Sequence, residues 1–294
     1  MVEGVLILAD GRKLGYAEGG PPDAPPVLYC HGFPANRREL RLIQPVLERR
    51  GVRARVVALN RPGYGPSTFQ ANRTFLDWPS DMAEAADQLG IDRFAVVGVS
   101  GGSPYALASG YALRDRVTRV GIVVGMAPIE ATGMETASAI SGPSANRLLR
   151  RFQFEMVAYA FKKGREDRFM EQSLSTMGDA DRLAVARPEM RDWMIEMMRE
   201  SLQQGGRAAA HEAGLYRQPW GFDPQQVTVP THLWYGGADK TVPASAGRWL
   251  TNRLPGSDYV LWPEHGHFTW MLGDEAAEVI AATIERHPSA GPGR

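Results

Sequence analysis

The chain has 294 residues, a formal net charge of +0 and 44% hydrophobic residues. It is therefore long enough for one large α/β domain, with room for an insertion, and too apolar for a disordered chain. The balanced charge provides no basic surface for nucleic acid or for an anionic membrane. Cys30 is the one cysteine, which excludes an internal disulfide framework and a cysteine-based metal cluster.

The N-terminus does not have the pattern of a signal peptide, because M-V-E-G-V-L-I-L-A-D-G lacks a basic first region and its apolar run is short. The longest apolar run, residues 120–128, has the length of a strand. A membrane helix needs roughly 20 apolar residues. We therefore expect a cytoplasmic protein that does not enter a membrane. The sequence leaves its oligomeric state undefined.

The first part of the chain alternates predicted strands and helices. A hairpin is expected over residues 4–17, with Asp10-Gly11 at its turn. Continuous apolar runs predict buried strands at 27–30, 56–59, 94–97 and 120–124. Helices are predicted near 37–50, near 77–89 and after 102. This alternation is typical of a mostly parallel sheet that is covered by helices on both faces.

Residues 129–218 differ from this pattern, because they contain helical periodicities and no convincing strand. Strand patterns resume at 232–235 and 259–262. We therefore predict an all-helical cap at 129–218 inserted into an α/β core formed by 1–128 and 219–294. Within the cap, Pro188 begins one helix, and one helical face carries Leu148, Leu149, Phe152 and Met156.

The motif G-V-S-G-G at 98–102 lies between an apolar strand and a predicted helix. G-x-S-x-G in that context predicts a sharp turn that exposes the hydroxyl of Ser100 in a strained backbone conformation. Gly98 and Gly102 leave room for the turn. The alternative is that Ser100 merely caps the helix. We interpret Ser100 as a nucleophile.

A serine nucleophile needs a base that accepts its proton. His267, in E-H-G-H-F, follows a strand near the C-terminus, where a loop can bring it to Ser100. His265 is the alternative. The other histidines fit the role less well. His31 is expected to be structural and His211 to be an exposed helix residue of the cap, while His232 lies at a strand start and His287 in the tail.

The base needs a carboxylate that orients its ring. Asp239 follows the strand at 232–235, and the chain order Ser, Asp, His is the one expected for this type of turn. Asp223 and Asp258 are the alternatives, and both are more simply interpreted as loop residues. The oxyanion of the reaction also needs donors. We expect the backbone N–H groups of Gly101 and Phe33 to supply them.

These motifs resemble those of the α/β-hydrolase fold superfamily, in particular its members with a helical cap. The motifs are H-G-F-P at 31–34, N-R-P-G-Y-G-P-S at 60–67, G-V-S-G-G at 98–102, G-G-A-D-K-T-V-P at 236–243 and E-H-G-H-F at 264–268. The resemblance covers about residues 4–128 and 219–284. It implies an eight-stranded type of sheet and the same roles for the five residues assigned above. The expected reaction needs no metal and no organic cofactor, and the sequence shows no cluster of metal ligands. The cap matches by position only.

Two departures from the family pattern bear on this interpretation. Relatives often have Asp where this chain has Asn60, a change that we expect to affect loop packing more than chemistry. Relatives similar to epoxide hydrolases and haloalkane dehalogenases share H-G-F-P, but they have Asp in the sharp turn between strand and helix, called the nucleophile elbow, where this chain has Ser100. Because this chain has Ser100 there, both activities are disfavoured.

The predicted function is serine hydrolysis of a small to medium, largely apolar carboxylic ester through an acyl-enzyme on Ser100. With the same triad, the alternatives are a carbon–carbon bond, thioester or lactone hydrolase, or a biosynthetic tailoring enzyme. An alternative of another class is a non-catalytic protein that binds a small molecule on the same fold.

The substrate pocket is expected to involve the cap, because nine of the 12 methionines lie between Met126 and Met198. The alternative for Met190, Met194 and Met197 is that they only pack the cap onto the core. The residues that we predict to line the pocket are Val99, Pro128, Trp193, Met194, Met197, Val242 and Phe268.

Overall fold

The computed structural model describes residues 1–131 and 145–285, with the side chain of Arg168 excepted. One eight-stranded sheet with the order β1-β2-β4-β3-β5-β6-β7-β8 forms its centre. The strands are β1 (Val2–Ile7), β2 (Lys13–Gly19), β3 (Pro26–Cys30), β4 (Arg55–Leu59), β5 (Phe94–Val99), β6 (Val117–Val123), β7 (Thr231–Gly236) and β8 (Asp258–Trp262). The pairs β1–β2 and β2–β4 are antiparallel and all other pairs are parallel. The predicted mostly parallel sheet is confirmed.

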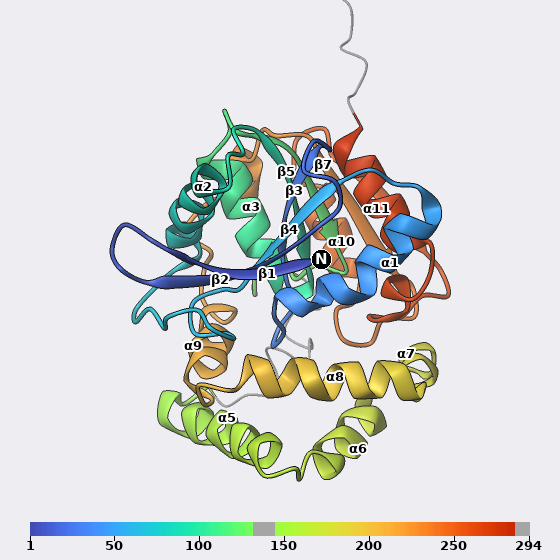
Figure 1. Cartoon of the computed structure of the whole chain (residues 1–294). Coiled ribbons are helices and arrows are strands. Elements are labelled where there is room, and N and C mark those ends of the chain that lie inside the picture. The colour runs from blue at the N-terminus through green and yellow to red at the C-terminus, as the bar shows by residue number, and fades with distance from the viewer. Residues whose placement is uncertain (132–144, 286–294) are drawn as a thin grey trace, which may run out of the picture.

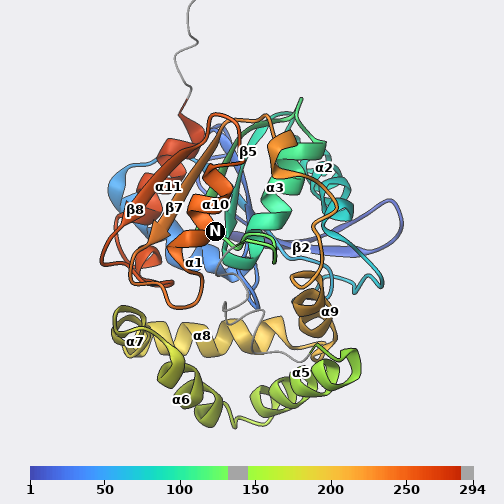
Figure 2. The same ribbon diagram turned by 180° about the vertical axis from the view of Figure 1, so that it is seen from behind.

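Helices cover both faces of this sheet (Figures 1 and 2). One face carries α1 (Leu40–Arg50) and α11 (Glu275–Ile284), and the other carries α2 (Trp78–Gln88), α3 (Ser103–Ala112) and α10 (Ala244–Thr251). All six residues of β5 are buried. Because a central strand packs against helices on both faces, its sequence is an uninterrupted apolar run.

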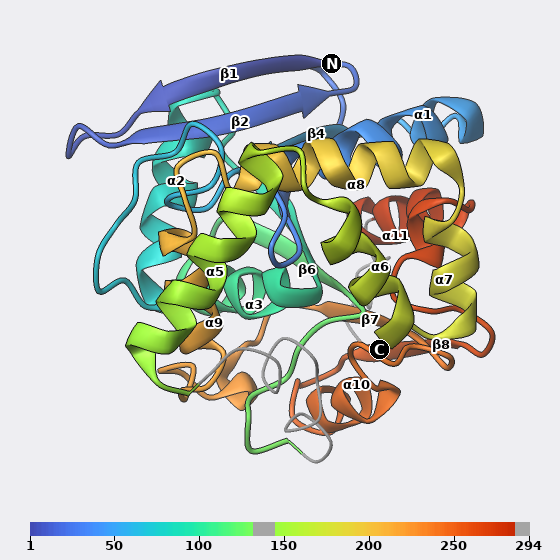
Figure 3. The same ribbon diagram turned by 90° about the horizontal axis from the view of Figure 1, so that it is seen from below.

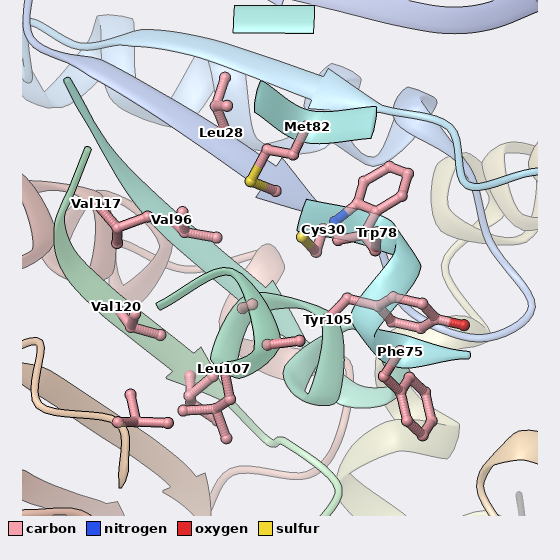
Figure 4. Close-up of a cluster of buried hydrophobic side chains, with 14 of the residues drawn as sticks. Leu28, Cys30, Phe75, Trp78, Met82, Val96, Tyr105, Leu107, Val117 and Val120 are labelled. Carbon is pink, nitrogen blue, oxygen red and sulfur yellow. The ribbon is translucent and has the colours of Figure 1, made fainter. Parts of the chain in front are cut away.

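One hydrophobic cluster lies on each face of the sheet, and a third, smaller cluster includes Phe161, Met197 and Leu202. Figure 4 shows part of the cluster on the α2 and α3 face, where Trp78, Met82 and Tyr105 lie over Cys30 and Val96. Cys30 is buried and its thiol is free. No helix within the described residues is long and apolar enough to span a membrane.

Between β6 and β7, the described residues form helices only, and we call α5–α9 the cap. They are α5 (Arg147–Lys162), α6 (Asp167–Thr176), α7 (Asp179–Val185), α8 (Pro188–Ser201) and α9 (Arg207–Leu215). Helix α8 crosses one end of the sheet, and α5 and α6 lie beyond it (Figures 1 and 3). The limits 129 and 218 stay predictions, and residues 132–144 of the predicted cap lie outside the described residues.

The loop after β3 holds the cap to the core. The Asn36 side-chain amide donates to the Met197 carbonyl over 2.8 Å and to the Ser201 hydroxyl over 2.9 Å. The Trp193 indole N–H donates to the Arg38 carbonyl over 3.2 Å. These bonds tie α8 directly to the segment that follows H-G-F-P.

The apolar helical face predicted near residue 150 lies on α5, and it points outward. Leu148, Leu149, Phe152 and Met156 are between 49% and 80% exposed. The opposite face of α5 is the buried one, through Ala158 and Phe161. Apolar periodicity alone therefore identified the helix but not the face that packs on the rest of the cap.

A buried charged cluster joins α9 to the loop of residues 60–67. Arg61 Nε and Glu212 Oε1 are 2.6 Å apart, and both side chains are fully buried. The Tyr64 hydroxyl donates to Glu212 over 2.5 Å, and Arg73 lies 3.5 Å from it. Burial alone would raise the pKa of Glu212, but the two guanidinium groups outweigh it and lower this pKa to about 2.

Glu212→Ala is expected to lower the free energy of unfolding by about 3–5 kcal/mol, because it leaves the Arg61 guanidinium buried without its partner. The folded-state pKa of Glu212 lies below the unfolded value of about 4.3, so this stability is present above that pH and is lost as the pH falls toward 2. Denaturant unfolding measures the change. Asp179→Ala, which removes the exposed partner of Arg182, is the control and should cost under about 1 kcal/mol. Equal losses for the two variants would contradict this account.

Candidate active site

Ser100 occupies the sharp turn between β5 and α3. Its φ is +51°, in the left-handed region that a residue with a side chain rarely adopts. A Cβ at Gly102 would overlap the carbonyl oxygens of Cys30 and His31, and one at Gly98 would overlap Ala106. The predicted strained backbone and the need for both glycines are therefore confirmed.

The imidazole of His267 lies between Ser100 and Asp239. Its Nε2 is 2.9 Å from Ser100 Oγ, and its Nδ1 is 2.7 Å from Asp239 Oδ2. All three side chains are buried. Oδ1 of Asp239 accepts the backbone N–H groups of Thr241 and Val242 over 2.7 and 2.9 Å. These two bonds fix the carboxylate, which in turn orients the ring, so the set has the geometry of a nucleophile, a base and an orienting acid.

Several charges act on the basicity of His267. Burial alone would lower the pKa of this imidazole, because it disfavours the charged form. The carboxylates of Asp239, Asp181 and Glu39 act in the opposite direction, and the net effect raises the pKa above its ordinary value. A raised pKa makes the ring a stronger base toward the Ser100 hydroxyl.

The structure does not bring the alternative residues to Ser100. His265 Nε2 lies 2.9 Å from Glu275 Oε1 instead. Asp223 caps the short helix at residues 224–226, through the Gln225 N–H, and Asp258 lies at the start of β8, 3.5 Å from His232. His287 lies outside the described residues.

Two further histidines have structural contacts of their own. His31 is buried, and its Nε2 accepts the Arg61 N–H over 3.2 Å, in agreement with the structural role predicted for it. His211 was expected to be an exposed cap residue, but it is half-buried and lies 3.1 Å from the Arg73 carbonyl. That expectation was wrong, because α9 packs on the loop that carries Arg73.

Phe33 lies beside Gly101. The two expected oxyanion donors have to be neighbours, because both would bind the same oxygen atom. A Cβ on Gly101 would lie 2.6 Å from that of Phe33. The loop that carries Phe33 is fixed on both sides: the Gly32 N–H donates to Glu39 over 3.1 Å, and the Gly32 carbonyl accepts from Arg61 over 2.8 Å. A loop held in this way can keep backbone donors in place before a substrate arrives.

Aromatic rings surround this loop and the triad. Phe33 makes edge contacts with Tyr216 and Phe154, with ring centroids 5.3 and 5.9 Å apart. The Tyr216 hydroxyl donates to the Gly101 carbonyl over 2.9 Å. Phe268 lies edge-on to the His267 ring at 5.2 Å. Aromatic rings therefore lie next to Gly101 and next to His267, the two residues on either side of the Ser100 hydroxyl.

The seven predicted pocket residues lie in several different parts of the structure. Val242 and Phe268 contact the triad through the bonds and rings described above. Val99 precedes Ser100 and is buried, and Met194 and Met197 are buried in packing clusters between the cap and the core. Trp193 is bound to Arg38, and Pro128 lines a separate surface depression with Trp220, Phe222 and Trp249. Their role toward a substrate stays a prediction.

Two buried acids near the triad have no motif that would identify them from the sequence. Burial raises the pKa of Glu39 to about 7, although its carboxylate accepts from Tyr29 and Gly32. Asp181 comes from α7 and accepts the backbone N–H groups of His267 and Phe268. No residue spacing predicts either contact, because each acid reaches the site through tertiary packing.

Asn60 holds its loop together. Its side-chain oxygen accepts the Arg37 backbone N–H over 2.6 Å, and its nitrogen donates to the Tyr64 carbonyl over 3.2 Å. These contacts support the expectation that the departure at this position affects loop packing.

The two histidines of E-H-G-H-F give a direct test of the site. His267→Ala is expected to slow covalent capture of Ser100 by a fluorophosphonate by at least about 10³-fold, because the hydroxyl loses its base. His265→Ala should change this rate less than about threefold, since its partner is Glu275. The rate is measured by intact mass, and equal losses in both variants would contradict the assignment.

Comparisons with known proteins agree with this fold. Residues 25–274 match the alpha/beta hydrolase fold family. The pimeloyl-[acyl-carrier protein] methyl ester esterase of Neisseria meningitidis serogroup B is 25% identical over 262 residues, which cover 87% of this chain and 91% of that protein.

Solved structures of two esterases share the architecture. The esterase from Exiguobacterium antarcticum has a TM-score of 0.72 and 19% identity, with 96% of this chain and 99% of that chain covered. The thermophilic esterase from Thermogutta terrifontis has a TM-score of 0.71 and 21% identity, with 96% and 97% covered. The family match spans most of the sequence and includes the region of Ser100, Asp239 and His267, so the chain belongs to the α/β-hydrolase fold family and is a hydrolase.

Proposed function

We propose that the protein is a serine esterase that cleaves a small to medium, largely apolar carboxylic ester through an acyl-enzyme on Ser100. The observation that carries this proposal is the position of His267, whose two ring nitrogens lie 2.9 Å from Ser100 Oγ and 2.7 Å from Asp239 Oδ2. A ring bound at both nitrogens can accept the serine proton while the carboxylate stabilises the imidazolium that forms.

In the first half of the proposed reaction, Ser100 Oγ attacks the ester carbonyl carbon and its proton passes to His267 Nε2. The carbonyl oxygen becomes an oxyanion, which the backbone N–H groups of Phe33 and Gly101 stabilise. Removing one such donor typically costs roughly 2.7–4 kcal/mol of the barrier. When the tetrahedral intermediate collapses, the alcohol leaves with the proton from His267 and the acyl group stays on Ser100.

In the second half, water attacks the acyl-enzyme and gives its proton to His267. The new tetrahedral intermediate collapses to the free carboxylic acid, and Ser100 regains its proton from the ring. The protein supplies every proton transfer through His267, and Asp239 keeps the ring in one orientation through both halves.

The aromatic rings beside the site support an apolar substrate. Phe33 lies next to Gly101, and Phe268 lies edge-on to the ring of His267. Aromatic rings in a buried site favour the binding of apolar acyl or alcohol groups, because transferring apolar surface out of water is favourable. The Neisseria relative is named as a methyl ester esterase, which supports ester cleavage as the reaction.

Hydrolysis of p-nitrophenyl esters of increasing acyl length tests the proposal. The protein should turn these esters over, and Ser100→Ala should lower the rate by at least about 10³-fold while the fold survives. Ser109→Ala is the matched control on α3, the helix that follows Ser100, because its hydroxyl donates to the Tyr105 carbonyl. It should keep the rate within about twofold.

Two results would overturn the proposal. Turnover that persists in Ser100→Ala would move the chemistry to another group. Tight binding of a substrate without turnover, equally strong in the wild type and in Ser100→Ala, would identify a binding protein instead.

A further inference from the structure

The cap reaches the catalytic histidine through one buried side chain. Asp181 lies on α7, and its residue is only 1% exposed. Its Oδ2 accepts the backbone N–H of His267 over 2.8 Å, and its Oδ1 accepts that of Phe268 over 2.7 Å. One carboxylate thus binds two consecutive N–H groups of the loop that carries the base.

The loop is shaped to receive this carboxylate. A Cβ added to Gly266 would overlap the Asp181 carboxylate, so only glycine allows the approach. The N-terminus of α7 also meets the other triad loop, since Gly178 lies against the Ala238 carbonyl and the side chain of Lys240. Helix α7 therefore touches both the segment before Asp239 and the segment of His267.

We propose that Asp181 is a positioning residue, which fixes the backbone of His267 from the cap and makes the placement of the base depend on the placement of α7. The proposal deepens the proposed esterase function and rests on it for its effect on turnover. Two charge-assisted bonds to adjacent N–H groups restrict the loop more than one bond would. A shift of about 1 Å in a reacting group can cost on the order of 10²-fold in rate.

Asp181 also adds negative charge beside the ring. The charged groups that face His267 are Asp239 from the loop after β7, Asp181 from α7 and Glu39 from the loop after β3. Asp181 itself faces His267 and Asp239, and burial raises its pKa although the two N–H groups oppose this. A negative charge at this position favours the protonated imidazole and thus a more basic ring.

The test compares Asp181→Asn with Asp179→Asn, the same change two residues away on the same helix. Asp179 is exposed and pairs with Arg182, so its variant is the matched control. The first readout is the pKa of the His267 ring, measured by side-chain NMR and assigned by comparison with His267→Gln. We expect this pKa to fall in Asp181→Asn, by up to about one unit, and to stay unchanged in Asp179→Asn.

The second readout is the ester kinetics of the same variants. We expect kcat to fall by on the order of 10–10²-fold in Asp181→Asn, with KM within about twofold, because the base and not the binding surface is displaced. The acid limb of the kcat/KM profile should move to lower pH together with the His267 pKa.

A double-mutant cycle separates positioning from a general loss of structure. Gly266→Ala should lower kcat in the wild-type background, because the added methyl group displaces the Asp181 carboxylate. In Asp181→Ala the same change should cost much less, since the carboxylate is absent. Thermal unfolding of each variant shows whether it is folded.

An unchanged His267 pKa and equal loss from Gly266→Ala in both backgrounds would overturn the proposal, whatever the substrate of the enzyme. If the His267 pKa falls in Asp181→Asn and not in Asp179→Asn, but the wild type hydrolyses no ester, the esterase function fails while the positioning role of Asp181 stands.

Discussion

The left-handed backbone at Ser100 is the constraint on which the rest of the site depends. A φ of +51° costs free energy for a residue with a side chain, and it persists because the surroundings enforce it. Gly98 and Gly102 admit α3 and the β3 loop at distances that a Cβ would prevent. The same turn presents the Ser100 hydroxyl to His267 and brings Gly101 beside Phe33. The position of the proposed nucleophile and that of the expected oxyanion donors are therefore consequences of one local conformation.

Buried charged side chains join the loops around Ser100 to helices α7 and α9 of the cap. Arg61 binds the Gly32 carbonyl on one side and Glu212 of α9 on the other. Glu39 binds the Gly32 N–H, and Asp181 of α7 binds the His267 loop. Each of these groups would destabilise the fold if it were left unpaired, so each enforces a specific contact. The cap is thus fixed to the core at the same loops that carry the proposed chemistry.

The sequence predicted much of this arrangement, for identifiable reasons. The strands were found because buried parallel strands are continuous apolar runs, and the elbow was found because only glycine fits on either side of Ser100. His267 was chosen because the segment E-H-G-H-F follows a strand near the C-terminus, where a loop can reach Ser100. His265 stayed the alternative, because only one residue separates the two histidines. Asp181 could not be found, since the two backbone N–H groups that it binds lie 86 and 87 residues away. Glu39 lies only 7 and 10 residues from its partners Gly32 and Tyr29, but no motif assigns a buried acid to that position. The outward apolar face of α5 shows the other limit: periodicity defines a helical face, but the neighbouring helices decide which face is buried.

Rapid-quench mass spectrometry tests most directly whether Ser100 carries the acyl group during turnover. During hydrolysis of a p-nitrophenyl ester, we predict a protein species heavier by the mass of the acyl group, and peptide mapping should locate that mass on Ser100. The adduct should form at a rate equal to or faster than the turnover rate, and it should disappear when the ester is exhausted. Turnover without an acylated species in Ser100-containing peptides, or an adduct on another residue that forms and decays at the turnover rate, would contradict this prediction.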